Sequence, residues 1–503
     1  MYYLGIDNGG TMAKVAIFDQ LCHQIAVCSE KVELIHPQHG WEEVNIDQLW
    51  ESNARAIKTV LEISGIDPAE IACIACTGHG NGMYLVDESG KGLVGIRSTD
   101  TRARKYIEEW NEKNTLDSVL PKTMQAIWAA QPNALLRWYM DNDPETLEKT
   151  RWMFMVKDLL RYRLTGEAYM ELTDASATSL MNNLTQEWDD EVLRTWGVES
   201  LRRILPPVVT TTQICGHVTA QAAAKTGLKE GTPVAGGMFD IDAVGVGIGM
   251  VDDQSLCLIS GTWGNNQYIS KTPVVSKDVF MTTCYSIPGY YLMLEGSATS
   301  ASNFEWFITN LFKADRELMK QKDETGSIYD LVNAEIAGTK PEDCNLVFLP
   351  YLYASPVNID ANACFIGLDA WQKRGHMIRA VCEGVVFGHY WHINRLMKFR
   401  DMPNPILLTG GASKSPIWCQ MFADIFQTVV RIPEATELGA LGAAIAASVA
   451  VGDYPDVETA CQNVVRFSQT YYPNSNLAGV YQKKREKFNK ILEIMQPHWS
   501  ELR

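Results

Sequence analysis

The sequence lacks several features that would place its 503 residues in a special class of protein. It has no apolar run long enough to span a membrane, no low-complexity segment, and no secretory signal ahead of its first apolar stretch. It also lacks an excess of positive charge: the formal net charge of -16 argues against nucleic acid or an acidic membrane surface as a partner. We therefore expect a cytoplasmic protein that binds small molecules.

Cysteine is present without forming a framework of spaced pairs. The 12 cysteines are scattered, which suits a reducing compartment. The close pair Cys73 and Cys76 lies in the apolar stretch IACIACTG, and we interpret it as strand packing. A metal or redox role would instead require a second pair or an exposed turn before a helix.

The length and the order of apolar segments predict two domains of an α/β class. The first part alternates strands and helices, and a glycine-rich region at 231–250 could contain the crossing between domains. The main expected elements are a hairpin over 4–19, a helix over 46–64, a buried strand over 71–76, helices within 102–164, a second hairpin over 255–270, a strand, turn and helix over 404–426, and a small-residue helix over 435–447.

The turn of the first hairpin, Asp7-Asn8-Gly9-Gly10-Thr11, has the composition of an anion-binding turn. Glycine lets backbone amides approach a phosphate, and Thr11 and Lys14 add donors. A carboxylate in the same turn would repel phosphate unless a divalent cation stands between them, so Asp7 suggests Mg²⁺. The alternative is a hairpin that uses Asp and Gly only to turn.

Two later glycine turns could serve the same ligand. Gly261-Thr262 heads the second hairpin and could hold the same phosphate chain from the other side. Gly410-Gly411 leads to a helix for which Ser415 is the expected N-cap, and this turn could accept a phosphate or an adenine. A strand-to-helix junction often uses glycine, so this turn alone is weak support.

Phosphoryl transfer to an alcohol needs a group that orients the hydroxyl and takes its proton. Asp240, in GGMFDIDAVG, is the candidate, and the spacing within this segment leaves Asp242 open as well. The alternative for Asp240 is a helix-capping acid.

Five segments together resemble the FGGY family of carbohydrate kinases. They are GIDNGGT from Gly5, GGMFD from Gly236, Gly261-Thr262, the region from Gly367-Leu368 to RAVCEG at 379–384, and TGGASKS from Thr409. The resemblance covers nearly the whole chain. It implies two actin-like (ribonuclease-H-like) ATPase domains, an N-terminal one over 1–246 and a C-terminal one over 247–503, with ATP and sugar in the interdomain cleft.

The resemblance also implies roles for individual residues. Asp240 matches the catalytic base, and Asp7, with Asp240, matches the acids near Mg²⁺. Gly10, Thr11 and Lys14 then belong to the first phosphate turn, and Gly261 and Thr262 to the contact with the terminal phosphates. Gly410, Gly411 and Ser415 match the adenosine-side turn.

The acceptor-binding loop implied by the resemblance is CTGHGNGMYLVD, from Cys76 to Asp87. It is most similar to the loop of L-xylulose (3-keto-L-gulonate) kinases, which would carry lysine at position 81 where this chain has Asn81. Losing that cation favours a neutral sugar over a sugar acid. His79, Asn81, Asp100 and Arg102 are the expected hydroxyl contacts. A structural ion pair is the alternative for the last two.

The sequence thus predicts an ATP- and Mg²⁺-dependent kinase for a ketopentose of the L-xylulose type. Alternatives are a kinase for erythritol, D-xylulose, ribulose or gluconate, or a non-catalytic sugar sensor on the same scaffold. A homodimer is compatible with the resemblance, although the sequence shows no signature of one. The exact sugar and its phosphorylated hydroxyl depend on pocket shape.

Overall fold

The computed structural model describes residues 1–321, 326–353, 355–358 and 360–502. They divide into two compact units, each made of three chain segments. Unit 1 contains residues 1–252, 269–293 and 435–466, and unit 2 contains 253–268, 294–434 and 467–503. The division at 246/247 stays a prediction, because these units follow packing rather than chain order.

The first sheet lies in unit 1 and has the strand order β13-β14-β5-β1-β2-β3, with β15 also paired to β5. β1, β2 and β3 are antiparallel neighbours, whereas β5 and β14 run parallel to β1 and to β5, respectively. The strands are β1 (Tyr2–Asn8), β2 (Met12–Phe18), β3 (Gln24–Lys31), β5 (Ile71–Gly78), β13 (Ile214–His217), β14 (Pro233–Ala235) and β15 (Met238–Phe239).

The second sheet repeats this plan in the order β18-β19-β17-β16-β22-β23-β24, with β18 at Met281–Cys284. β16 and β17 form an antiparallel hairpin, and β22 runs parallel to β16. The strands are β16 (Leu256–Ser260), β17 (Gly264–Ser270), β19 (Tyr291–Ser297), β22 (Ile406–Gly410), β23 (Val430–Pro433) and β24 (Phe467–Tyr471). The shared plan confirms the predicted actin-like fold with a hairpin at the head of each half.

The remaining strands form smaller sheets. In unit 1, β4-β7-β6-β8 form a four-stranded sheet, and β9 with β12 and β10 with β11 form pairs. β20 pairs with β21 in unit 2. Their bounds are β4 (Glu43–Val44), β6 (Met83–Val86), β7 (Gly92–Ile96), β8 (Trp152–Phe154), β9 (Met170–Glu171), β10 (Met181–Asn182), β11 (Glu187–Trp188), β12 (Val208–Val209), β20 (Val347–Leu349) and β21 (Cys364–Ile366).

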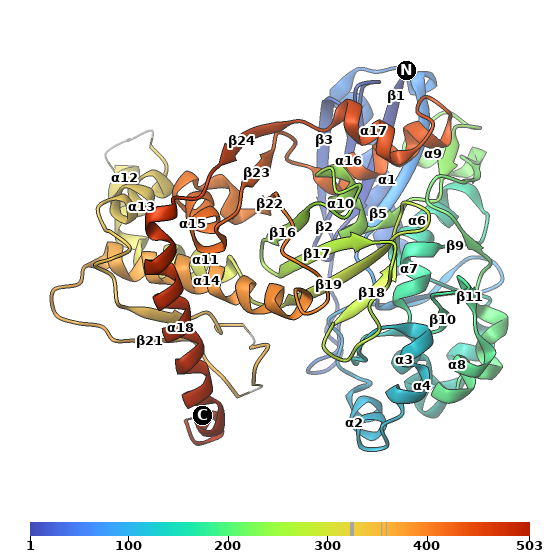
Figure 1. Ribbon diagram of the computed structural model, residues 1–503. Coiled ribbons are helices and arrows are strands. Elements are labelled where there is room, and N and C mark those ends of the chain that lie inside the picture. Colours follow the sequence, from blue (N-terminus) through green and yellow to red (C-terminus); the bar gives the residue numbers. More distant parts are fainter. Residues whose placement is uncertain (322–325, 354, 359, 503) are drawn as a thin grey trace. The chain divides into compact units, whose positions relative to one another are not determined.

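Helices cover the sheets of each unit (Figure 1). Those of unit 1 are α1 (Ile46–Ser64), α2 (Arg104–Glu112), α3 (Leu116–Thr123), α4 (Pro132–Asn142), α5 (Pro144–Lys149), α6 (Val156–Thr165), α7 (Leu172–Ala177), α8 (Asp190–Trp196), α9 (Ala220–Thr226), α10 (Asp240–Gly247), α16 (Leu438–Ala450) and α17 (Val457–Val464). Those of unit 2 are α11 (Ser302–Leu311), α12 (Lys313–Gln321), α13 (Ile328–Ala337), α14 (Arg374–Leu396), α15 (Pro416–Phe426) and α18 (Ala478–Met495).

The ends of α1 show why its predicted range was correct. The Asn45 side chain accepts hydrogen bonds from the backbone N–H groups of Asp47 and Gln48, which caps the first turn. The helix ends at Gly65, whose φ of 66° is a left-handed conformation that glycine adopts easily. Between these ends, apolar side chains such as Trp50 and Ile57 pack against the first sheet.

Helix α16, predicted as a small-residue helix, packs very closely in unit 1. A Cβ atom at Gly5 of β1 would lie 2.2 Å from the Ala440 carbonyl oxygen, and one at Gly442 would lie 2.1 Å from that of Ala243 in α10. Side chains larger than hydrogen are therefore excluded at these two glycines. Figure 1 shows α16 beside β1, although the two are far apart in sequence.

Two further observations bear on the expected class of protein. Cys73 and Cys76 are buried in β5, and burial raises the pKa of each thiol to about 12, as expected for packing residues. No helix in the described part of the chain is both long and apolar enough to cross a lipid bilayer.

Candidate active site

The first hairpin of unit 1 ends in the predicted acid, Asp7. Asp7 lies near the end of β1, opposite Lys14 in the antiparallel register. Its carboxylate sits against the backbone of α16, where a Cβ at Gly439 would come within 2.4 Å of Oδ2. Thr11, in the turn itself, is exposed. The small-residue helix thus leaves room for the carboxylate while the turn stays open to solvent.

Lys14 was predicted to donate to a phosphate, but it has a protein partner. Its Nζ lies 2.8 Å from Glu437 Oε2, just before α16. Both side chains are partly exposed, so this pair is only weakly stabilising. Lys14 could reach a phosphate only by leaving or sharing Glu437.

The two candidate bases, Asp240 and Asp242, lie in different environments at the start of α10. The N-cap of this helix is Phe239, so Asp240 is not the capping residue. Asp240 is partly exposed, whereas Asp242 is fully buried and accepts a hydrogen bond from the Ser286 N–H at 3.1 Å. Of the two acids, Asp240 is the one that a substrate can reach.

Burial and nearby negative charges raise the pKa values of the acids in this region. Burial raises the pKa of Asp7 to about 6, although the Lys14 ammonium opposes the shift. Burial, followed by the charges of Asp7 and Asp174, raises the pKa of Asp240 well above its usual range. Burial likewise raises the pKa of Asp174 to about 7, against the effect of Lys157. The charges of Asp7 and Asp174 thus act on Asp240 in the same direction as its burial.

The acids fit a divalent cation that is shared with a ligand. Among the described residues, no three His, Cys, Asp or Glu side chains gather into a complete metal site. Mg²⁺ keeps several waters and is bound through one or two carboxylates plus substrate phosphates, so a pair of acids is the expected contribution of the protein. The Asp7 charge raises the pKa of Asp240, and a cation held by both carboxylates would offset this repulsion.

The predicted acceptor loop is buried and packs beside Asp240. A Cβ at Gly80 would come within 2.3 Å of the ring of Phe239, the residue before Asp240. Asn81 has a φ of 60°, is 4% exposed, and leaves its side-chain Oδ1 without a hydrogen-bond partner. An unpaired buried acceptor is costly, so this atom is suited to a hydroxyl donor from a ligand.

His79 lies in the same loop but already has a partner, since its Nε2 is 2.9 Å from the Tyr84 hydroxyl. Burial, with a smaller effect of the Arg97 charge, lowers the pKa of His79 to about 4. The imidazole is therefore neutral near pH 7.

Asp100 and Arg102, the other two expected acceptor contacts, are bonded to each other. Arg102 Nη2 lies 2.9 Å from Asp100 Oδ2, and Arg102 also reaches Glu43 at 2.7 Å. The guanidinium stacks on the Trp41 ring at 4.2 Å. Asp100 further accepts a hydrogen bond from the Glu42 N–H at 2.8 Å. These contacts favour the structural ion pair that the sequence left open.

Arg97 is a cation that the sequence reasoning missed. A Cβ at Gly10, in the first turn, would lie 2.1 Å from Arg97 Nη2. The other terminal nitrogen, Nη1, is 2.9 Å from Glu42, and the buried Nε has no hydrogen-bond partner. The guanidinium therefore lies against the turn predicted to hold phosphate, and its charge also reaches His79. Arg97 directly follows β7 and is distant in sequence from the turn, so its contact with Gly10 could not be predicted from the sequence.

Unit 2 forms a cavity of about 630 Å³ at the second hairpin turn. Gly261 and Thr262 line it, together with Gly411 and Ser415 from the strand-to-helix turn. The predicted turn residues of the nucleotide side are thus brought together. Gly410 is not part of the lining, but its φ of 93° and its contact with the Ser260 carbonyl require glycine there.

Ser415 is the N-cap of α15, as predicted, and its side chain accepts the Trp418 N–H. Its hydroxyl also donates to Asn333 Oδ1 at 2.7 Å. One detail differs from the prediction: a short 3-10 helix, η3 (Gly411–Lys414), separates the glycine turn from α15.

Aromatic rings in this cavity were not predicted. The Phe304 ring lies 4.9 Å from that of Trp418 and 6.5 Å from that of Tyr329, with the latter pair stacked. All three line the cavity, and Tyr329 is 40% exposed. Flat rings beside a phosphate-type turn are suited to a nucleobase. The rings come from three distant segments, so no local pattern announces them.

Comparison with known proteins gives matches over nearly the whole chain. Models described as the N-terminal and C-terminal domains of the FGGY family of carbohydrate kinases match residues 2–247 and 256–451. A probable L-xylulose kinase of Pasteurella multocida is 34% identical over 500 residues, which are 98% of this chain and 99% of the relative. The L-xylulose/3-keto-L-gulonate kinase of Escherichia coli is 32% identical, with 98% and 97% covered.

Solved structures share the fold. A ligand-bound xylulose kinase from Lactobacillus acidophilus superposes with a TM-score of 0.90 at 23% identity, covering 100% of both chains. A gluconate kinase from the same organism gives a TM-score of 0.89 at 23% identity, with 100% of this chain and 99% of that chain covered.

Proposed function

The chain belongs to the FGGY family of carbohydrate kinases, and we propose that this sugar kinase transfers the γ-phosphoryl group of ATP to a hydroxyl of a ketopentose of the L-xylulose type. The observation that carries this proposal is that Asp7 and Asp240 come to the same end of β5, where Asp7 is in register with Thr77, and Phe239, the residue before Asp240, is in register with Gly78. Relatives named L-xylulose kinase, at 32–34% identity, support the acceptor.

In this proposal Asp240 orients the acceptor hydroxyl and takes its proton. Its raised pKa suits a base, because a carboxylate of ordinary pKa holds a proton poorly. Asn81 accepts a hydrogen bond from another hydroxyl of the sugar, which would satisfy its unpaired Oδ1. Mg²⁺ held by Asp7 and Asp240 would offset the charge of the ATP phosphates.

The cavity of unit 2 is assigned to the nucleotide in the same proposal. The rings of Phe304, Tyr329 and Trp418 would hold the adenine, and the turns at Gly261 and Gly411 would hold the phosphate chain. A sensor without catalysis would not need to keep both acids, so their retention favours the kinase over the sensor.

A sugar acid is the second candidate acceptor, and Arg97 is the observation in its favour. The acceptor loop has Asn81 where the L-xylulose kinases that it resembles would carry a lysine. Arg97 brings a guanidinium whose charge acts on His79 of that loop and helps lower the pKa of its imidazole. A carboxylate on the acceptor could pair with this guanidinium.

An acceptor panel tests the proposal. ADP release with Mg-ATP is measured against L-xylulose, D-xylulose, ribulose, erythritol, glycerol, gluconate and 3-keto-L-gulonate. The proposal expects the highest kcat/KM for a neutral ketopentose. A clear preference for the two sugar acids would select the second candidate. Tight sugar binding with no ADP release from any acceptor would contradict the kinase activity and support the sensor.

A further inference from the structure

A group of five charged side chains lies completely buried behind Asp240 in unit 1. Each side chain is 0% exposed, and we call the group the buried ion network: Lys157, Asp158, Arg161, Glu171 and Asp174. Lys157 Nζ lies 3.0–3.3 Å from all three carboxylates of the network. Removing so many charges from water costs several kcal/mol for each ion, and apolar residues can often replace such networks without loss of stability. Folding stability alone therefore does not explain this network.

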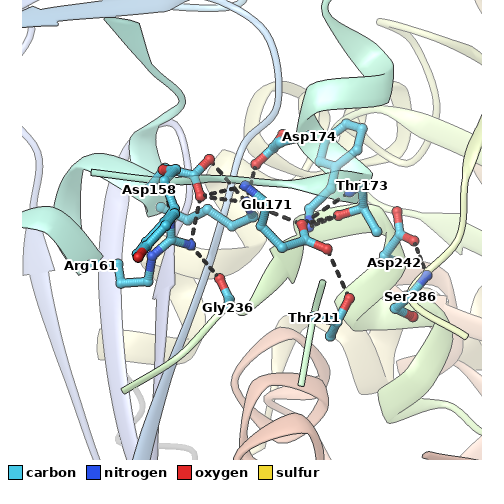
Figure 2. Close-up of polar contacts among 12 residues, drawn as sticks. Asp158, Arg161, Glu171, Thr173, Asp174, Thr211, Gly236, Asp242 and Ser286 are labelled. Atoms are coloured by element: carbon cyan, nitrogen blue, oxygen red, sulfur yellow. Dashed lines mark hydrogen bonds and ion pairs between the residues drawn. The ribbon is translucent and has the colours of Figure 1, made fainter. Parts of the chain in front are cut away.

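The network reaches the backbone next to Asp240 through one hydroxyl. Thr173 Oγ1 accepts a hydrogen bond from the Phe239 N–H at 2.8 Å and donates to Glu171 Oε2 at 2.6 Å. Phe239 directly precedes Asp240. Figure 2 shows Thr173 and Glu171 together at the edge of the network. The hydroxyl is thus fixed by a charge on one side and fixes the N-terminal end of α10 on the other.

The network also holds the start of the same turn. Arg161 Nη1 donates to the Gly236 carbonyl at 2.7 Å, and Glu171 Oε1 accepts from the Thr211 hydroxyl at 2.8 Å (Figure 2). The Gly237 N–H in turn donates to the Thr211 carbonyl at 3.0 Å. A Cβ at Gly237 would lie only 1.9 Å from the Cys76 carbonyl oxygen. The turn from Gly236 to Phe239 therefore has little freedom at either end.

We propose that the buried ion network positions Asp240 for the reaction, and that the Thr173 hydroxyl is the group that transmits this position. The inference rests on the proposed function, in which Asp240 contacts the acceptor. Thr173 does not touch the substrate and is a positioning residue. A displacement of about 1 Å at a reacting group can cost on the order of 100-fold in rate.

The test compares Thr173→Val with Thr173→Ser. Valine keeps the shape of the side chain and removes the hydroxyl, whereas serine keeps the hydroxyl. We expect Thr173→Val to lower kcat by about 10- to 100-fold, with KM for ATP and for the sugar within about twofold of wild type. Thr173→Ser should recover kcat to within about threefold.

Thr226→Val is the matched control. Thr226 is equally buried, and its hydroxyl also makes one donated and one accepted hydrogen bond, to the Ala222 carbonyl at 2.7 Å and from the Leu228 N–H at 3.2 Å. It lies on α9 and does not contact the turn before Asp240. We expect a loss of Tm similar to that of Thr173→Val and an unchanged kcat.

The outcomes separate the inference from the proposed function. Equal, small effects of both valine variants on kcat would overturn the inference, because the network would then be structural only. Crystal structures of wild type and Thr173→Val provide a readout that needs no turnover. Displacement of the Asp240 carboxylate in the variant supports the inference even if no acceptor is phosphorylated, and an unmoved carboxylate contradicts it.

Discussion

Units 1 and 2 place different chemistry beside hairpins of the same plan. In unit 1 the hairpin of β1 and β2 ends at Asp7, whose charge acts on Asp240. In unit 2 the hairpin of β16 and β17 opens on a cavity lined by aromatic rings. The shared strand order shows that the fold does not decide this difference. In the proposed function, one copy of this scaffold supplies acid–base chemistry and the other binds the nucleotide.

Removal of the Asp240 carboxylate in unit 1 is expected to have the largest effect on activity. Asp240→Asn keeps the shape of the side chain but removes the base, so kcat for sugar-dependent ADP release should fall by about 10²–10⁴. Asp242→Asn is the matched control, because Asp242 lies two residues on and is buried. If Asp242→Asn abolished turnover while Asp240→Asn retained it, the role of base would move to Asp242.

Substitution of Arg97 tests whether its guanidinium in unit 1 binds a carboxylate of the acceptor. If a sugar acid is turned over, Arg97→Met should raise its KM by about 10- to 100-fold through loss of a charged hydrogen bond, and leave the KM of neutral sugars within about twofold. Arg151→Met, at an exposed arginine stacked on Trp152, is the control. A uniform fall in kcat for all acceptors would instead indicate that Arg97 acts on the phosphoryl group.

Tyr329→Ala tests whether the aromatic cavity of unit 2 binds the nucleotide. Loss of one stacking ring should raise the Kd of ATP by about 10-fold and leave kcat at saturating ATP nearly unchanged. Tyr472→Ala removes a ring that is 70% exposed and outside the cavity lining, and should leave Kd unchanged. An unchanged Kd in Tyr329→Ala would remove Tyr329 from the nucleotide site.

His79 gives the smallest predicted effect, which concerns stability. Its pKa is lowered to about 4 in the folded chain, so the unfolded chain binds the proton first as pH falls below about 6.5. Folding should therefore lose up to about 3 kcal/mol from this group between pH 7 and pH 4. Chemical unfolding of wild type and His79→Gln across this range measures the difference, and parallel pH profiles would contradict the buried neutral imidazole.

Local elements were predictable because short-range patterns determine them. The hairpins, α1 and the Ser415 N-cap follow from alternation, caps and glycine within a few residues. The partners of these elements were not predictable. Lys14 pairs with Glu437 across 423 positions, and α16 belongs to unit 1 although it lies late in the chain.

For the candidate site as well, local motifs were predictable from the sequence, whereas contacts between distant segments were not. Asp240 and the glycine turns are carried by compact motifs, so the sequence could propose them. Arg97 meets Gly10 only after β7 and the first hairpin have folded together, and the rings of the unit 2 cavity gather from three segments. The pairing of Asp100 with Arg102 depended on geometry that residue spacing could not resolve.

The measurement that most directly tests the division of labour between the two units is titration of Asp240→Asn with ATP, alongside its ADP release with the preferred sugar. The account predicts a Kd for ATP within about threefold of wild type, together with the loss of turnover, because the aromatic cavity is intact in this variant. Loss of ATP binding together with turnover would contradict it, since the contacts of the unit 2 cavity would then be insufficient to bind the nucleotide.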